Sequence, residues 1–211
     1  MGYTTDFYGQ FDLNKKLDLL LHVYLKRFSE VRHMKRDPNK IAQLISLKRF
    51  KEYLTLFGGV GTEAEFFIDG KENYMGDDAD PSVLDHNQPP STQPSLWCQW
   101  LPSEDGLHIE WDGGEKFYEY VEWLQYICDN FLAPKGYILN GSVRYQGEDS
   151  DDAGWIVCEN NQCRLSPGML VPVEQSVTAE PEPAPAKKPR KPRLKKMTFS
   201  PVAKRVLNLD D

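Results

Sequence analysis

The sequence predicts an α+β domain in which an antiparallel sheet is packed by about three helices, followed by a disordered C-terminal tail. Short alternating apolar and polar segments, separated by hairpin turns, indicate the strands. Longer segments repeat apolar residues at the spacing of one helical face. After residue 173 the composition changes to Pro, Ala, Glu and Lys, which cannot form a core. The 211 residues, of which 40% are hydrophobic, fit one domain with an extension.

The N-terminal part predicts one strand and two helices. Residues 4–11 alternate around two phenylalanines and predict a short strand. Asn14 is the expected N-cap of the first helix, and its apolar face comprises Leu17, Leu20, Leu21, Tyr24, Leu25 and Phe28. Asp37 followed by Pro38 is a typical helix start, so we expect a second helix from there to Gly58.

The middle of the chain predicts a loop and a hairpin. Residues 65–69 predict a short strand, and the polar residues 69–95, rich in Gly, Pro and Asp, predict one long surface loop. Strands are expected around residues 96–100 and 107–111, joined by a turn at 103–106.

The third helix is expected to begin at Asp112, because Asp112 and Glu115 have the spacing of a capping box. Pro134 and Gly136 should end it. The final strands are expected at residues 137–146, 155–158 and 163–165, with turns at 147–154 and at Asn160–Asn161.

The four cysteines and four histidines show no metal-binding spacing. We therefore expect Cys98, Cys128, Cys158 and Cys163 to be free and mostly buried thiols, with no metal and no cofactor. No apolar run approaches the ~20 residues of a membrane span, and the first residues carry no secretory signal. The sequence thus predicts a cytoplasmic protein with no membrane partner.

Charge is segregated along the chain, whose formal net charge is −7. Residues 26–51 carry a net charge of +7, and residues 52–152 a net charge of −17. This pattern divides the chain into an acidic α+β domain (1–173), a disordered Pro/Lys/Arg-rich linker (174–196) and a short amphipathic segment (197–211). A helix in the last segment is expected only when it docks on another surface.

The most charged part of the linker is residues 187–196, hereafter the basic tail. It contains seven basic residues and no acidic one: Lys187, Lys188, Arg190, Lys191, Arg193, Lys195 and Lys196. Its composition is typical of arms that bind nucleic acid, because phosphate contacts need charge and reach rather than a fold. The alternative is a tail that solubilises the protein or lies on its own acidic body.

Several stretches together resemble an uncharacterised family of small proteins from bacteria and their phages. They are GYTTDF (2–7), MKRD (34–37), QPSLWCQW (93–100), IEWDGGEKFY (109–118) and residues 136–149. The resemblance covers about residues 1–165 and leaves out the basic tail. It implies a bacterial or phage origin and a cytoplasmic setting, and it carries no activity.

The densest group of reactive side chains is Glu110, Asp112, Glu115 and Lys116, at an expected strand-to-helix junction. Carboxylates there could hold a divalent metal or act as an acid–base pair, and the acidic residues 148–152 could add ligands. The alternative is structural, with Asp112 and Glu115 capping the helix and 148–152 forming a solvated turn. None of the common catalytic motifs is present.

These observations favour a non-enzymatic binding or regulatory protein of phage or bacterial origin. Its body would bind a protein, and its basic tail would contact nucleic acid or dock on a partner. Two alternatives remain open. One is a metal-dependent hydrolase or transferase that uses Glu110, Asp112, Glu115 and Lys116. The other is an acidic inhibitor that mimics DNA.

Overall fold

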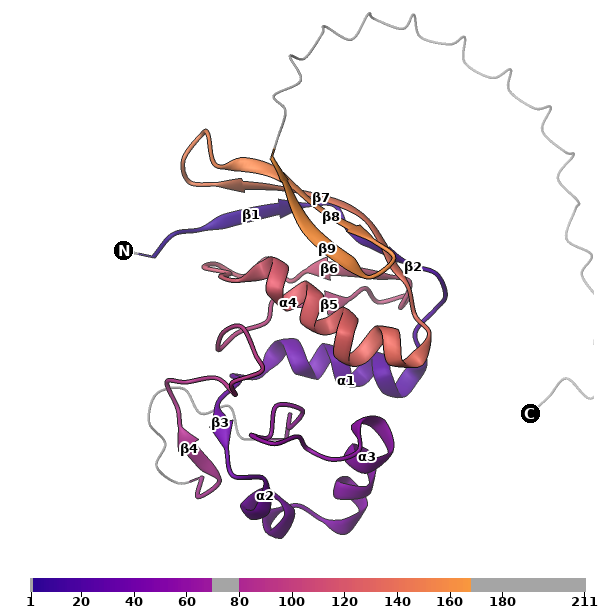
Figure 1. Cartoon of the computed structure of the whole chain (residues 1–211), viewed down its shortest axis with the longest axis vertical. Coiled ribbons are helices and arrows are strands. Elements are labelled where there is room, and N and C mark those ends of the chain that lie inside the picture. Colours follow the sequence, from indigo (N-terminus) through magenta and orange to yellow (C-terminus); the bar gives the residue numbers. More distant parts are fainter. Residues whose placement is uncertain (1, 70–79, 168–211) are drawn as a thin grey trace, which may run out of the picture. The chain divides into compact units, whose positions relative to one another are not determined.

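The computed structural model describes residues 2–69 and 80–167 (Figure 1). This part of the chain is an α+β domain, as predicted: a seven-stranded antiparallel sheet is covered by helices. The predicted linker (174–196) and amphipathic segment (197–211) lie outside the described residues, as does the end of the predicted acidic domain.

The strands of the large sheet follow the order β5-β6-β2-β7-β8-β9, and β1 also pairs with β7. Every neighbouring pair is antiparallel. The strands are β1 (Thr5–Tyr8), β2 (Phe11–Leu13), β5 (Trp100–Pro102), β6 (His108–Trp111), β7 (Leu139–Gly147), β8 (Ala153–Glu159) and β9 (Gln162–Pro167). The predicted hairpin at 96–111 and the three final strands are therefore present, with shifted ends.

The strand predicted over residues 4–11 is present as β1 and ends at Tyr8, and a second strand, β2, begins at Phe11. Both pair with β7, with Phe7 opposite Tyr145 and Asp12 opposite Asn140. Between the two strands Gly9 has a φ of 111°, and Gly141 of β7, which lies beside Gln10 and Phe11, has a φ of 126°. Only glycine adopts such angles readily, so this pair of residues allows the edge of β7 to accept two short strands in place of one.

Helix α1 (Leu19–Glu30) begins at Asp18, whose carboxylate accepts a hydrogen bond from the Leu21 N–H at 2.9 Å. The predicted cap at Asn14 is wrong, because the Asn14 Oδ1 accepts from the Ile138 N–H of the chain leading into β7. The predicted apolar residues are buried except Leu20, which is 45% exposed.

The second predicted helix is two helices, α2 (Pro38–Leu44) and α3 (Leu47–Phe57). It starts after Asp37 and ends at left-handed Gly58 as expected, but Ser46 caps a new helix through the Arg49 N–H. Residues 65–66 lie in a turn, and residues 65–69 contain no strand. The described part of the predicted loop at 69–95 contains β4 (Val83–Asp85), which pairs with β3 (Lys35–Arg36).

Helix α4 (Tyr120–Ile127) has Glu119 as its N-cap, seven residues later than the predicted cap Asp112. Asp112 is not its cap, because its Oδ1 accepts from the Gly114 N–H in a local turn. Lys116 and Glu119 have positive φ angles of 60° and 53°, which a helix excludes. The helix continues through a π-helical turn (Cys128–Leu132) and a 3₁₀ turn (Ala133–Lys135), and it ends at Gly136 as predicted.

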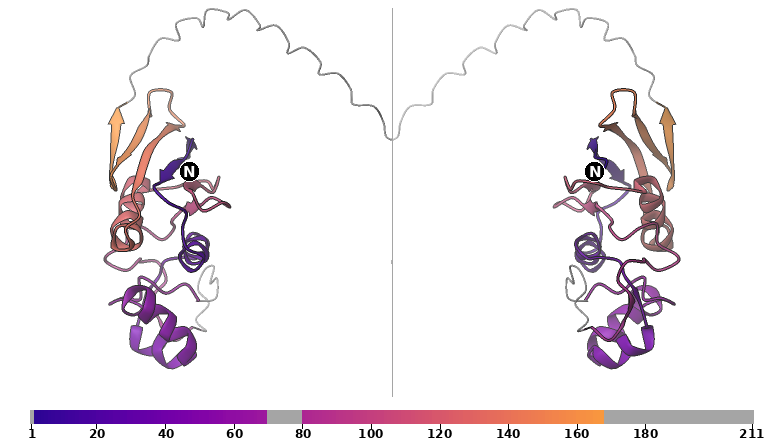
Figure 2. Two further views of the ribbon diagram at one scale, coloured as in Figure 1. Left: turned by 90° about the vertical axis from the view of Figure 1, so that its right-hand side faces the viewer. Right: turned by 90° about the vertical axis from the view of Figure 1, so that its left-hand side faces the viewer.

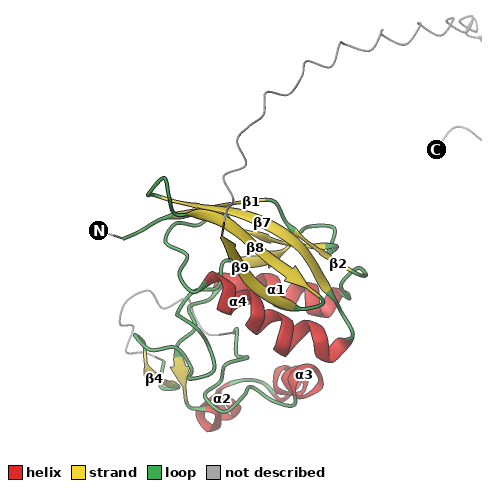
Figure 3. Ribbon diagram, turned by 45° about the horizontal axis from the view of Figure 1, so that its top comes forward, coloured by secondary structure: helices red, strands yellow, loops and turns green. Residues whose placement is uncertain are grey.

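Helices α1 and α4 cover one face of the sheet, and α2 and α3 lie farther from it (Figures 2 and 3). Helix α4 contacts both β5 and β9, the two ends of the strand order. The sheet therefore curves around α4, and the fully buried Phe28, Trp123 and Phe131 fill the interior. Within residues 2–69 and 80–167, no helix has the length and apolarity needed to cross a bilayer.

Candidate functional site

The predicted cluster of Glu110, Asp112, Glu115 and Lys116 lies at the end of β6 and in the loop that follows. Its carboxylates do not converge. Among the described residues, only one group of three or more His, Cys, Asp or Glu side chains brings its ligand atoms together, within 4.8 Å of one another. That group consists of three cysteines. Burial raises the pKa of Asp112, and the Gly114 N–H partly offsets that rise. The backbone oxygen of Glu115 accepts from the Gln99 side chain at 2.9 Å. The hydrogen bonds of Asp112 and Glu115 thus stabilise the loop that follows β6.

The acidic turn at 148–152 holds the N-terminus against the sheet. The Glu148 carboxylate accepts from the Thr4 N–H at 2.8 Å, and the Asp152 carboxylate accepts from the Tyr3 hydroxyl at 2.6 Å. The bond to Asp152 raises the pKa of Tyr3, because the phenol donates to a negative group. These carboxylates thus have partners within the fold.

Four of the nine basic residues at 26–51 form ion pairs within the described structure, and three of these four pair with acidic residues that follow the block in sequence. Arg36 pairs with Asp80 and donates to the Ser82 hydroxyl, and Lys35 pairs with Glu63 at 2.6 Å. Arg49 pairs with Glu52 and Asp69. The hydrogen bond from Lys35, together with that from the Ser91 N–H, lowers the pKa of Glu63 to about 2. These three basic residues therefore fasten residues 63–69 and 80–82 to β3 and α3.

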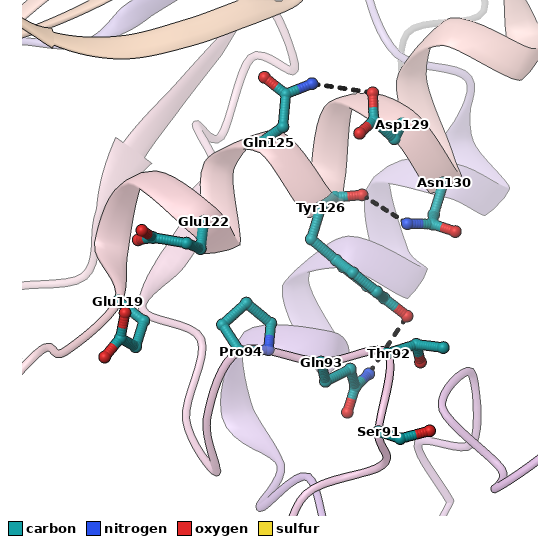
Figure 4. A pocket seen from close by; sticks show the side chains of 10 residues that line it. All are labelled: Ser91, Thr92, Gln93, Pro94, Glu119, Glu122, Gln125, Tyr126, Asp129 and Asn130. Carbon is teal, nitrogen blue, oxygen red and sulfur yellow. Dashed lines mark hydrogen bonds between the residues drawn. The ribbon is translucent and has the colours of Figure 1, made fainter.

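A groove of about 520 Å³ runs between α4 and the loop at residues 91–94, hereafter the α4 groove (Figure 4). Side chains from both walls line it: Ser91, Thr92, Gln93, Pro94, Glu119, Glu122, Gln125, Tyr126, Asp129 and Asn130. The apolar face of α4 points into the core, with Trp123, Leu124 and Ile127 buried. The groove therefore lies along the opposite face of α4.

Hydrogen bonds fix both walls of the α4 groove. On the loop side, the buried Gln93 Nε2 donates to the Glu65 carbonyl at 2.7 Å and to the Tyr126 hydroxyl at 3.4 Å. On the helix side, the Gln125 Nε2 donates to Asp129 at 2.8 Å and to the Asn161 carbonyl at 3.0 Å. These hydrogen bonds thus hold the loop and the helix that form the two walls of the groove in place.

The α4 groove carries negative charge that the fold leaves unbalanced. Glu119, Glu122 and Asp129 line it, and within the described ranges none of the three forms an ion pair. Burial raises the pKa of the Tyr126 phenol, which therefore stays neutral at the groove wall. Such a surface favours a cationic ligand. The helical spacing of the acidic residues is visible in the sequence, but the loop that forms the other wall is not.

The cysteines differ from expectation at one pair. Cys98 and Cys128 are free and buried, as predicted. Cys158 and Cys163 form a disulfide across the β8–β9 pair, so the prediction of free thiols is wrong there. Burial raises the pKa of the Cys128 thiol to about 12, which makes it a weak nucleophile toward the nearby disulfide.

No protein-family model, curated protein or solved structure matches this chain. The predicted nucleic-acid-binding residues Lys187 to Lys196 lie outside the described part of the chain, and their role stays a prediction.

Proposed function

We propose that this chain is a non-enzymatic binding or regulatory protein with two charged surfaces. The acidic body binds a protein partner by accepting a Lys/Arg-rich segment in the α4 groove, and the basic tail contacts nucleic acid. A bacterial or phage origin and a cytoplasmic setting, both implied by the family resemblance, belong to this proposal.

The observation that carries the proposal is the distribution of unpaired charge. Arg36 and Arg49 are held by carboxylates of the body, while Glu119, Glu122 and Asp129 have no ion-pair partner in the described structure. The body therefore offers negative charge to a partner at the α4 groove. The densest positive charge in the sequence is the basic tail, with seven basic residues in ten.

The α4 groove combines charge with hydrogen-bonding and apolar groups. Lys or Arg side chains can pair with its carboxylates, and an extended backbone can contact Gln125, Asn130 and Ser91. Each exposed ion pair contributes only about 0.2–1 kcal/mol. Three such pairs amount to roughly 0.6–3 kcal/mol, so binding should be weak and sensitive to salt.

The groove is tested by titrating the full-length chain with a synthetic Lys/Arg-rich peptide at low ionic strength. Reversal of Glu119, Glu122 and Asp129 to Lys should weaken binding about tenfold or more, as expected for the loss of roughly 1.4 kcal/mol. The matched control reverses Asp6, Glu104 and Asp151, whose exposed side chains form no hydrogen bond or ion pair among the described residues. Equal weakening in both variants would mean that net charge alone attracts the peptide.

The basic tail is tested by fluorescence anisotropy with a duplex DNA and a single-stranded RNA across a salt series. Seven phosphate contacts predict a slope of log affinity against log salt of about −6 for duplex DNA. Replacing the seven basic tail residues by Gln should abolish this dependence. A control that replaces Lys40, Lys48 and Lys51 of the body by Gln should retain most of it. Unchanged binding by the tail variant would remove nucleic acid from the proposal.

One outcome would favour the acidic DNA mimic. If duplex DNA displaces this protein from a basic partner, and the groove variant no longer binds that partner, the carboxylates of α4 occupy a phosphate-binding surface. The hydrolase alternative has no comparable support, because the carboxylates of Glu110, Asp112 and Glu115 do not gather around one point.

A further inference from the structure

Three cysteines, one from the end of α4 and two from the β8–β9 hairpin, meet behind α4. Cys128 is the first residue of the π-helical turn, Cys158 lies on β8, and Cys163 lies on β9. Their sulfur atoms are all within 4.8 Å of one another, and the Sγ atoms of Cys128 and Cys163 are 3.9 Å apart. In the described structure this is the one place where at least three candidate metal-ligand atoms come together.

The fold brings these sulfurs together through a hairpin and a side-chain clamp. Cys158 and Cys163 face each other across β8 and β9, whose turn places Asn160 and Asn161 at φ angles of 51° and 67°. Gln125 of α4 then fastens the hairpin to the helix: its Oε1 accepts from the Cys163 N–H at 2.9 Å, and its Nε2 donates to the Asn161 carbonyl.

The helix contributes Cys128 at a break in its regular hydrogen bonding. The Ala133 N–H bonds to the Cys128 carbonyl in the wider π-helical register. π-Helical turns are rare and often mark functional positions. Here the turn begins at the residue whose sulfur completes the cluster.

The distance between the Cys128 and Cys163 sulfurs fits coordination of one ion by thiolates. With metal–sulfur bonds of about 2.3 Å, two thiolates on a tetrahedral ion lie about 3.8 Å apart, close to the 3.9 Å between Cys128 and Cys163. Thiolates select soft ions such as Cu⁺ and Zn²⁺. Cys128 and Cys158 are buried, while Cys163 is partly exposed, so an ion can enter from the side of β9.

We propose that the reduced chain binds one thiophilic metal ion through Cys128, Cys158 and Cys163, and that the Cys158–Cys163 disulfide is the form that cannot bind it. A dithiol reductant supplies two electrons and two protons, which break the S–S bond and leave two cysteine thiols and the oxidised reductant. Binding of the ion then releases protons from the coordinating thiols. Three thiolates satisfy Cu⁺, whereas Zn²⁺ adds a water molecule as a fourth ligand.

The test measures metal binding by full-length protein, reduced by a dithiol that is then removed under anaerobic conditions. Zn²⁺ and Cu⁺ are added separately in competition with a chromogenic chelator, and bound metal is quantified by mass spectrometry. The reduced chain and a Cys98→Ser control should each bind one equivalent of at least one ion. Cys128→Ala should bind at least tenfold more weakly or not at all.

A second comparison needs no substitution and so does not depend on whether a variant folds. The same chain with its disulfide intact should lose high-affinity binding, and reduction should restore it. The proposal is overturned if the reduced chain binds neither ion, if the oxidised chain binds as tightly as the reduced one, or if Cys128→Ala leaves affinity unchanged. One bound equivalent of Zn²⁺ without Cu⁺ binding, or the reverse, identifies the ion and supports the site.

Discussion

The ion pair between Arg36 and Asp80 ties β3 to the segment before β4, and its removal should be costly. The Arg36 side chain is 4% exposed and that of Asp80 is 16% exposed. Arg36 also donates to the Ser82 hydroxyl at 2.8 Å and lies 5.4 Å from the centre of the Phe67 ring. Asp80→Asn removes the negative charge and leaves a guanidinium without its counter-ion in this buried place.

Breaking a buried pair by removing one partner typically costs about 3–5 kcal/mol. Asp80 retains some contact with water, so we expect the lower end, about 3 kcal/mol. In a domain of this size that corresponds to a fall in Tm of roughly 6–12 °C. The measurement is urea and thermal denaturation followed by circular dichroism.

The control is the exposed pair of Arg164 and Glu159, whose side chains are 56% and 67% exposed. Glu159→Gln should cost at most about 0.5 kcal/mol. A double-mutant cycle of Asp80→Asn with Arg36→Met should show strong coupling, because each side chain matters chiefly through the other. If Asp80→Asn costs no more than Glu159→Gln, the pair is not buried in solution and the reasoning is refuted.

Three further predictions concern His33, Glu63 and Asp18. Burial lowers the pKa of His33 to about 3, so as pH drops the imidazole binds a proton in the unfolded chain before it does in the folded one. The free energy of unfolding should therefore fall as pH drops from about 6.5 toward 3. His33→Phe should flatten that part of the stability profile, and an unchanged profile would contradict a buried neutral imidazole. Lys35 and the Ser91 N–H lower the pKa of Glu63 to about 2. These contacts should stabilise the fold fully above about pH 4.5, and their contribution should be lost as pH falls toward 2. In Glu63→Gln this acid-dependent loss should disappear from denaturation curves. Asp18→Ala should cost about 1 kcal/mol by removing the cap of α1, and denaturation of an Asp18→Asn control, which keeps an accepting oxygen, should show a smaller loss.

Local sequence patterns predicted the features that local chemistry decides. The apolar face of α1, the start of α2 after Asp37 and the ends at Gly58 and Gly136 are all present. In each case the residues concerned determine the conformation of the segment to which they belong. The turn at Asn160–Asn161 was predicted for the same reason.

The errors arose where distant contacts decide between equivalent local signals. Asn14 and Asp18 are both suitable caps, and the bond from Ile138 to Asn14 leaves Asp18 as the cap. Asp112 has the spacing of a capping box, but left-handed Lys116 and Glu119 delay the start of α4. No pattern near either residue shows which of these outcomes applies.

The α4 groove and the cysteine cluster depend still more on tertiary structure. The spacing of Glu119, Glu122 and Asp129 places them on one helical face, but the sequence does not show that residues 91–94 form the opposite wall. Similarly, Cys128 and Cys163 are 35 positions apart, and only the docking of the β8–β9 hairpin on α4 brings their sulfurs to 3.9 Å.

The most direct test of the binding proposal is to map a cationic peptide on the ¹⁵N-labelled full-length chain by NMR chemical-shift perturbation. The proposal predicts saturable shifts concentrated at residues 91–94 and 119–130, which weaken as salt is added. Shifts spread evenly over the acidic surface, or confined to other elements while the groove stays unchanged, would contradict it.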